Sequence, residues 1–359
     1  MITISLCMIV KDEEAVIERC LSSVKDVVDE INIVDTGSMD KTKEIVSLFT
    51  DRIFDFQWID HFAAARNYSF QQATKDYILW LDADDVLSEQ DQEKLNELKE
   101  TLAADIDAVS MNYHLSFDAE GNVNSLLRRN RLVKREKNFE WVGAVHEYLS
   151  VGGNILHSDI SVSHLPLSHD HNRNIEIYHK LVKSGEPLSP RDTYYYANEL
   201  YDHMQYEQAI FYYEQFLTSK RGWIEDNINA CFKLADSFTH LHDHENKLNA
   251  ILRSFTYDIP RPEACCRLGL HFMEQFKNLE AIHWYEQALL AKQQPYAPFQ
   301  NNTFTTWLPH LQLCVLYDRL KQYEIANAHN ERAGTFIPND PKIQFNKEYF
   351  AKVLKKEAE

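Results

Sequence analysis

The stretch YILWLDADD, from Tyr77 to Asp85, constrains the fold of this chain more than any other part of the sequence. Its first five residues are apolar or aromatic, which is typical of one short buried strand, and three carboxylates follow within the next four positions. Strands that are apolar on both faces occur mainly in parallel sheets covered by helices, where ligands bind outside the carboxyl ends of the strands. The stretch therefore predicts an α/β domain with a binding site at its acidic end.

The acidic end has the spacing of a metal site. Asp82 and Asp84 are separated by one residue and Asp85 follows directly, and carboxylates so crowded repel one another unless they share a cation. Mg²⁺ and Mn²⁺ prefer oxygen ligands and are often held by one or two protein carboxylates, with water and substrate phosphate completing the shell. The spacing predicts a metal–diphosphate site. The alternative is a solvated turn in which Asp84 and Asp85 only favour a helix that begins at Ser88.

Segments typical of strands and helices alternate through the first half of the chain. Three strand-like segments precede Tyr77, each followed by a helical pattern: residues 2–10, 30–34 and 52–58. This alternation predicts a parallel sheet with right-handed crossovers. Further on, an alternating strand over 107–117 and a return strand over 126–133 predict a hairpin with its turn at 118–122.

The second half is helical from Pro190 onward and carries a weak internal repeat. Each copy is a pair of helices in which the second helix has an alanine that permits close packing: Ala209, Ala250, Ala281 and Ala326. The pattern resembles tetratricopeptide repeats, with inserted loops that make the intervals uneven. Such repeats form a groove that often binds peptide or protein. The alternative is a structural cap or a dimer surface, which would make the protein a homo-oligomer.

Composition narrows the choice of partners and compartment. The formal net charge of −18 at pH 7 makes nucleic acid an unexpected partner. No apolar run approaches the roughly 20 residues that span a bilayer, so no transmembrane segment is expected. The six cysteines form no C-x-x-C pair or regular framework, which is typical of buried thiols in a reducing compartment. We expect a cytoplasmic protein with two domains.

Four motifs in this order resemble glycosyltransferase family 2, which has the GT-A fold: Lys11–Glu14, Val34–Ser38, Phe62–Asn67 and Leu81–Asp84. With the Gly143–Glu147 segment and the helical repeats, the chain is similar to the subgroup that carries C-terminal tetratricopeptide repeats. Some members of that subgroup are S-glycosyltransferases that modify bacteriocin precursors. The resemblance implies a GT-A domain over residues 1–175 and a tetratricopeptide-like helical domain over 176–359.

The resemblance also implies a reaction. A metal-dependent, inverting transferase would move a hexose or N-acetylhexosamine from a UDP-sugar, with Mn²⁺ or Mg²⁺, to an acceptor. The acceptor would be a peptide or protein side chain held by the repeats, or else a cell-surface glycan or lipid-linked molecule. A different class of function is a non-catalytic scaffold whose helical half binds protein and whose α/β half senses nucleotide.

Four residues match the family's nucleotide-binding positions. Asp35 would contact the uracil, Glu13 would face the nucleoside, Arg66 would bind a base edge or phosphate, and Asp82 would approach the ribose. Three of them also have a structural explanation. Asp35 would shape the loop around Gly37, Glu13 would favour the first turn of a helix, and Arg66 would pair with Asp60 or Asp82.

The resemblance gives the metal site to Asp84, with Asp82 beside it. His164 matches a histidine that completes the metal or diphosphate site in many GT-A enzymes. A histidine that ends a strand is otherwise a polar terminus.

An inverting reaction needs one general base on the acceptor side. Glu147, with its neighbour His146, is the catalytic candidate, and Asp85 is its rival. Trp141 would stack on a sugar or lie in the core. A basic run would balance phosphate charge, contact an acidic acceptor, or form a solvated strand face: Arg128, Arg129, Arg131, Lys134 and Arg135.

Overall fold

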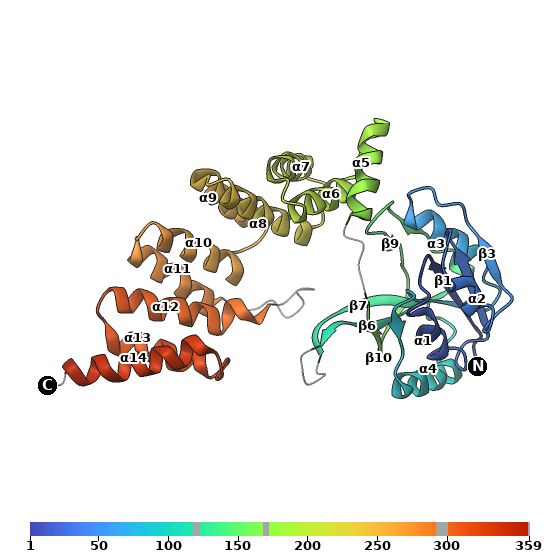
Figure 1. Cartoon of the computed structure of the whole chain (residues 1–359), viewed down its shortest axis with the longest axis horizontal. Helices are drawn as coiled ribbons and strands as arrows, with labels where there is room; N and C mark the ends of the chain where they lie inside the picture. The colour runs from blue at the N-terminus through green and yellow to red at the C-terminus, as the bar shows by residue number, and fades with distance from the viewer. Residues whose placement is uncertain (118–122, 168–171, 292–300, 358–359) are drawn as a thin grey trace. The chain divides into compact units, whose positions relative to one another are not determined.

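The computed structural model describes residues 1–117, 123–167, 172–291 and 301–357 (Figure 1). The chain divides into two compact units, Met1–Leu188 and Ser189–Glu359. The sequence-based boundary at residue 175 falls inside helix α5 (Arg173–Ser184), which packs on the first unit. Tyr178 of α5 is fully buried there, and the Nζ of Lys180 lies 2.7 Å from the Oδ2 of Asp60. Helix α5 therefore belongs to the first of the two compact units.

The first unit is built on one eight-stranded sheet in the order β3-β2-β1-β4-β7-β6-β10-β5. The first four strands are parallel to one another, as the alternation predicts, and β6 and β7 form the predicted antiparallel hairpin. The predicted turn at 118–122 lies outside the described residues. Because β7 inserts antiparallel between β4 and β6, the sheet is mixed. The strands are β1 (Ile4–Val10), β2 (Glu30–Asp35), β3 (Ile53–Asp55), β4 (Tyr77–Trp80), β5 (Asp85–Val86), β6 (Ala108–Phe117), β7 (Val123–Lys134) and β10 (Ile155–His164).

Helices cover both faces of this sheet, which explains why its central strands are apolar throughout. Leu6 and Leu79 belong to the main core on the face covered by α1 (Ile17–Ser22) and α4 (Glu89–Thr101). Cys7 and Ile78 face the opposite side. Helix α3 (Phe62–Gln71) packs on that side. The remaining elements of the unit are α2 (Thr42–Val46), η1 (Arg135–Lys137) and a two-stranded sheet of β8 (Trp141–Val142) and β9 (Tyr148–Leu149). The predicted start of α4 is confirmed, since the Ser88 side chain accepts a hydrogen bond from the backbone N–H of Asp91.

The second unit consists of helices that pack as successive pairs (Figure 1). The predicted alanines lie in the second helix of each pair and are at most 4% exposed, which confirms the helical repeat. At Gly269 the pairing is so close that a Cβ would lie 2.7 Å from the ring of Tyr285. The helices are α6 (Pro190–Asp202), α7 (Tyr206–Ser219), α8 (Ile224–His240), α9 (His244–Arg253), η2 (Ser254–Thr256), α10 (Pro262–Glu274), α11 (Asn278–Leu290), η3 (Asn302–Thr305), α12 (Trp307–Arg319), α13 (Tyr323–Gly334) and α14 (Pro341–Glu357). In the described part of the chain, every helix is too short or too polar to span a bilayer.

Candidate functional site

The acidic segment turns sharply after β4. The backbone N–H of Asp85 donates to the carbonyl of Asp82 over 3.1 Å, and the N–H of Asp82 donates to the Oδ2 of Asp85 over 2.9 Å. Asp85 then enters β5 and pairs with His164 at the end of β10. The turn thus brings the end of β4 and the end of β10 together, although 79 residues of sequence separate Asp85 from His164.

Three side chains converge at this turn. Ligand atoms of Asp84, Asp85 and His164 all lie within 4.8 Å of one another. The Nδ1 of His164 is 3.3 Å from the Oδ1 of Asp84 and 3.7 Å from the Oδ1 of Asp85. These two carboxylates raise the pKa of His164 to about 10.

The donor set fits a hard divalent cation. It offers two carboxylates and one imidazole, and carboxylate oxygens are the ligands that Mg²⁺ and Mn²⁺ prefer. The Oδ1 of Asp85 is buried and has no hydrogen-bond partner within the described structure. A buried acceptor left without a donor is costly, and a cation would satisfy it.

Asp82, which the sequence places in both the metal and the nucleotide set, lies outside this group of three. Its Oδ1 accepts a hydrogen bond of 2.7 Å from the Nη2 of Arg66, so the structural alternative for Arg66 is present. The Nε of the same guanidinium donates to the Oε1 of Glu147 over 2.6 Å. Burial by itself would raise the pKa of Asp82, but Arg66 and Arg131 more than offset it and lower this pKa to about 2.

Glu147 and His146 lie in the loop between β8 and β9. Strand β8, which precedes this loop, is hydrogen-bonded to α3: the side-chain amide of Asn67 donates to the carbonyl of Trp141, and its oxygen accepts from the N–H of Trp141. The Glu147 side chain is only 12% exposed and faces Arg66. His146 is half-buried and has a left-handed backbone, with φ of 50°. Arg66 therefore connects Glu147, a predicted catalytic residue, to Asp82 in the acidic turn.

Two predicted roles meet physical objections. Asp85, the rival base, is fully buried and its Oδ2 is 2.9 Å from the Nη1 of Arg131, so an acceptor cannot reach it. This burial argues against a role as base and favours a role as ligand. Trp141 is 4% exposed and packs edge to face on Trp80, which is the core alternative rather than a sugar platform.

Two predicted nucleotide residues lie near neighbouring strand ends: Asp35 ends β2, and Glu13 lies three positions after the end of β1. Asp35 is buried and accepts hydrogen bonds from the N–H groups of Gly37 and Ser38, so it shapes its loop as the alternative predicts. Burial would raise its pKa, but these hydrogen bonds and Lys43 lower it. Burial and the charge of Asp84 raise the pKa of Glu13 to about 7. Glu13 therefore lies within electrostatic reach of the acidic turn.

Sequence reasoning missed the importance of Arg131. It grouped this residue with a basic run that would balance phosphate charge, contact an acidic acceptor or form a solvated strand face. Arg131 is fully buried, while Arg128 lies near the surface and hydrogen-bonds Ser110 and Asn112. The guanidinium of Arg131 contacts the acidic turn through Asp85. Composition of the run gives no signal that separates these two arginines.

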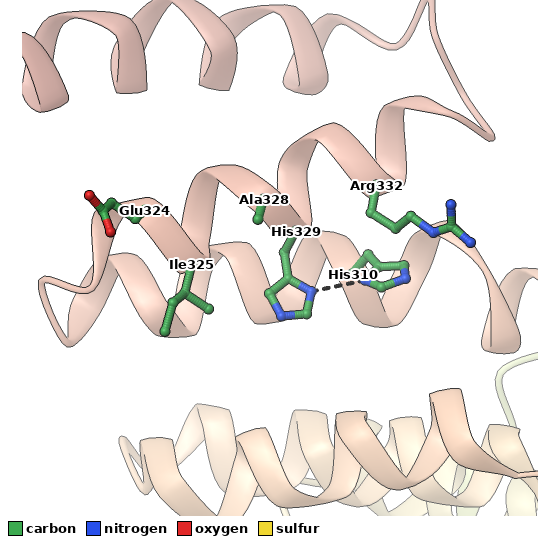
Figure 2. Close-up of a pocket in the computed structure, with 6 residues that line it drawn as sticks. All are labelled: His310, Glu324, Ile325, Ala328, His329 and Arg332. Carbon is green, nitrogen blue, oxygen red and sulfur yellow. Dashed lines mark hydrogen bonds between the residues drawn. The ribbon is translucent and has the colours of Figure 1, made fainter.

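The second unit has a pocket of its own between α12 and α13, with a volume of about 360 Å³ (Figure 2). The two histidines that line it, His310 and His329, share a hydrogen bond of 2.9 Å between their Nδ1 atoms. Burial and the neighbouring His329 lower the pKa of His310 to about 4, so the pair is neutral at physiological pH. Ile325, Ala328 and Arg332 complete one side of the pocket. The predicted site residues lie in the first unit.

The chain is similar to several known proteins. Residues 5–151 match the family model of glycosyl transferase family 2. The SPbeta prophage-derived glycosyltransferase SunS of Bacillus subtilis is 27% identical over 231 residues, which cover 60% of this chain and 54% of that protein. A TPR repeat-containing protein of Synechococcus elongatus is 49% identical over 87 residues, which cover 24% of this chain and 22% of that protein.

A crystal structure of MamA aligns with 51% of this chain and 92% of its own, at 17% identity and a TM-score of 0.38. The chain spans about half the length of the glycosyltransferase SunS and about a fifth of the length of the Synechococcus protein. The family match covers β1 to β9, which includes the acidic turn and Glu147. Residues 5–151 are therefore a glycosyl transferase family 2 domain.

Proposed function

We propose that this protein is a metal-dependent, inverting glycosyltransferase that moves a hexose or N-acetylhexosamine from a UDP-sugar to a peptide or protein side chain. One observation carries the proposal. Asp84, Asp85 and His164 converge outside the carboxyl end of a central strand, within or next to residues that match the family. In open α/β sheets that edge is where ligands bind.

These three residues would hold Mn²⁺ or Mg²⁺. The cation would neutralise the charge of the diphosphate as the nucleotide leaves. Asp35 and Glu13 lie at or near the ends of the neighbouring strands β2 and β1, where the nucleoside of the donor would bind. A carboxylate at either strand end would accept a hydrogen bond from a base or ribose.

Glu147 is the proposed general base. Its Oε1 is held by Arg66, and the low exposure of the side chain fixes the direction of the carboxylate. Its second oxygen would accept the proton of the attacking acceptor group. General-base assistance is typically worth about 10²–10⁴-fold in rate. Arg66 would keep the distance between Glu147 and Asp82 constant during the reaction.

The helical unit is the proposed acceptor-binding part. Its stacked helix pairs form the kind of extended surface that repeat proteins use to bind other chains. The similarity to a glycosyltransferase named SunS supports the assignment of the protein as a transferase. We place the protein in the cytoplasm, because its six cysteines are all free and buried.

UDP binding tests the proposal before any acceptor is known. Calorimetry would measure UDP affinity with Mn²⁺ and with chelator for the wild type and for Asp84→Asn. A matched control is Asp159→Asn, which removes an exposed carboxylate of the same unit. We expect Mn²⁺ to strengthen UDP binding in the wild type and the control but not in Asp84→Asn. Equal binding with and without metal in the wild type would contradict the metal-dependent mechanism, and binding without any later turnover would favour the scaffold.

A further inference from the structure

We propose that Arg131 is a positioning residue that holds Asp85 as a metal ligand. The Nη1 of Arg131 lies 2.9 Å from the Oδ2 of Asp85, and both side chains are fully buried. This contact engages one oxygen of the carboxylate and leaves the other, Oδ1, on the side of His164. The inference rests on the proposed metal site and names the residue that completes it.

Arg131 is itself held from several directions. Its guanidinium carbon lies 3.9 Å from the centre of the Trp80 ring and 4.4 Å from the centre of the Tyr113 ring. The Nη1 also donates to the carbonyl of Trp80 over 3.2 Å. Planar guanidinium groups stack on aromatic rings in this way, whereas a lysine ammonium has no flat face to stack. The site thus selects arginine by shape as well as by charge.

The backbone of β7 is deformed at this residue. Leu132 pairs with Val109 and Asn130 pairs with Ser110, so Arg131 is an extra residue with no partner on β6. Such a bulge re-aims one side chain of a strand, and bulges are frequent next to active sites. Here the bulge directs Arg131 inward, toward the end of β4 and the acidic turn.

Stability alone does not account for this arrangement. Burial of an ion pair costs desolvation of both charges, so apolar residues of similar volume often stabilise a core equally well or better. The Nε and Nη2 of Arg131 are also buried without a hydrogen-bond partner in the described structure, which adds to the cost. We therefore explain the presence of the buried Arg131 guanidinium by its effect on Asp85.

That effect has two parts. The guanidinium of Arg131 places a compensating positive charge against the buried Asp85 carboxylate, and the fixed contact to Oδ2 orients Oδ1 toward Asp84 and His164. Because Oδ2 also accepts from the N–H of Asp82, the same carboxylate fixes the turn that carries Asp84. Residues that orient metal ligands in this way typically change metal affinity about 10–100-fold when they are removed.

Mn²⁺ binding, followed by the electron paramagnetic resonance of the free ion, tests the inference without any turnover. The variants are Arg131→Met, Asp85→Asn and the double variant. Arg131→Met is expected to weaken Mn²⁺ binding by about 10–100-fold, close to the loss in Asp85→Asn. If Arg131 acts through Asp85, the double variant binds no worse than Asp85→Asn. Losses that add in the double variant, or wild-type affinity in Arg131→Met, would overturn the inference.

A control separates positioning from general damage to the fold. Arg261→Met breaks a comparable ion pair with Glu225 in the helical unit and is expected to bind Mn²⁺ like the wild type. If Arg131→Met does not fold, Arg131→Lys takes its place. It keeps the charge but not the stacking, and we expect a smaller loss that again disappears when Asp85 is already Asn; a loss that persists there contradicts the inference. Absence of Mn²⁺ binding in the wild type would instead refute the proposed metal site.

Discussion

Replacement of Arg66 by methionine tests how the two carboxylates of the site are held. Arg66 bridges Asp82 and Glu147, and its side chain is only 11% exposed. Loss of one partner of a buried ion pair typically costs about 3–5 kcal/mol, because the remaining charge is left without compensation. The Asp82 side chain is a third exposed, so water compensates part of this loss and the lower value of about 3 kcal/mol applies.

For a unit of this size, about 3 kcal/mol corresponds to a drop in Tm of about 6–12 °C. Urea unfolding, followed by tryptophan fluorescence, measures the free energy directly, and Trp80 and Trp141 both lie against Arg66. In the Arg66→Met background, Glu147→Gln removes a carboxylate that has lost its ion-pair partner, and it is expected to recover part of the lost free energy of unfolding. A loss below about 1 kcal/mol, or a further loss on adding Glu147→Gln, would refute the reasoning.

Three other outcomes follow from the geometry. Gly269→Ala should lower the urea midpoint of the helical unit, because overpacking against Tyr285 costs about 1–3 kcal/mol and exceeds the roughly 1 kcal/mol that alanine gains in a helix; an unchanged midpoint contradicts it. His310 has a folded pKa below its unfolded value, so its contribution to stability is lost as the pH falls from about 6.5 toward about 4. Unfolding of His310→Gln should therefore depend less on pH across that range. His164 is protonated below about pH 10, so Mn²⁺ should displace about one proton, which calorimetry in buffers of different ionisation enthalpy would count; no release would contradict its role as ligand.

The alternation of segments predicts most of the first unit because hydrophobic periodicity is a local property. The four parallel strands and the β6–β7 hairpin follow from it directly. The alternation cannot predict that β7 lies between β4 and β6, because the pairing of β7 with β4 joins segments far apart in the sequence. The helical repeat is predicted for a similar reason, since alanines at close helix contacts recur once in each pair.

The candidate site is predicted less completely, and two residues show why. The spacing Asp82-x-Asp84 predicts that the first and third residues share an ion. In the structure, ligand atoms of Asp84 lie beside those of Asp85 and His164, and the Oδ1 of Asp82 accepts a hydrogen bond from Arg66. Arg131 belongs to a basic run that is typical of an exposed strand face, yet it lies at a bulge in β7 and is fully buried. Both outcomes depend on backbone geometry rather than on residue type.

Release of UDP from a panel of UDP-sugars, with Mn²⁺ or with chelator, tests the central claim most directly. The wild type would be compared with Asp84→Ala and with Asp159→Asn as a surface control. We predict release from one donor sugar that requires both the metal and Asp84 and that the control retains. Release that persists with chelator and in Asp84→Ala, or a wild type that neither turns over nor binds UDP, would contradict the account.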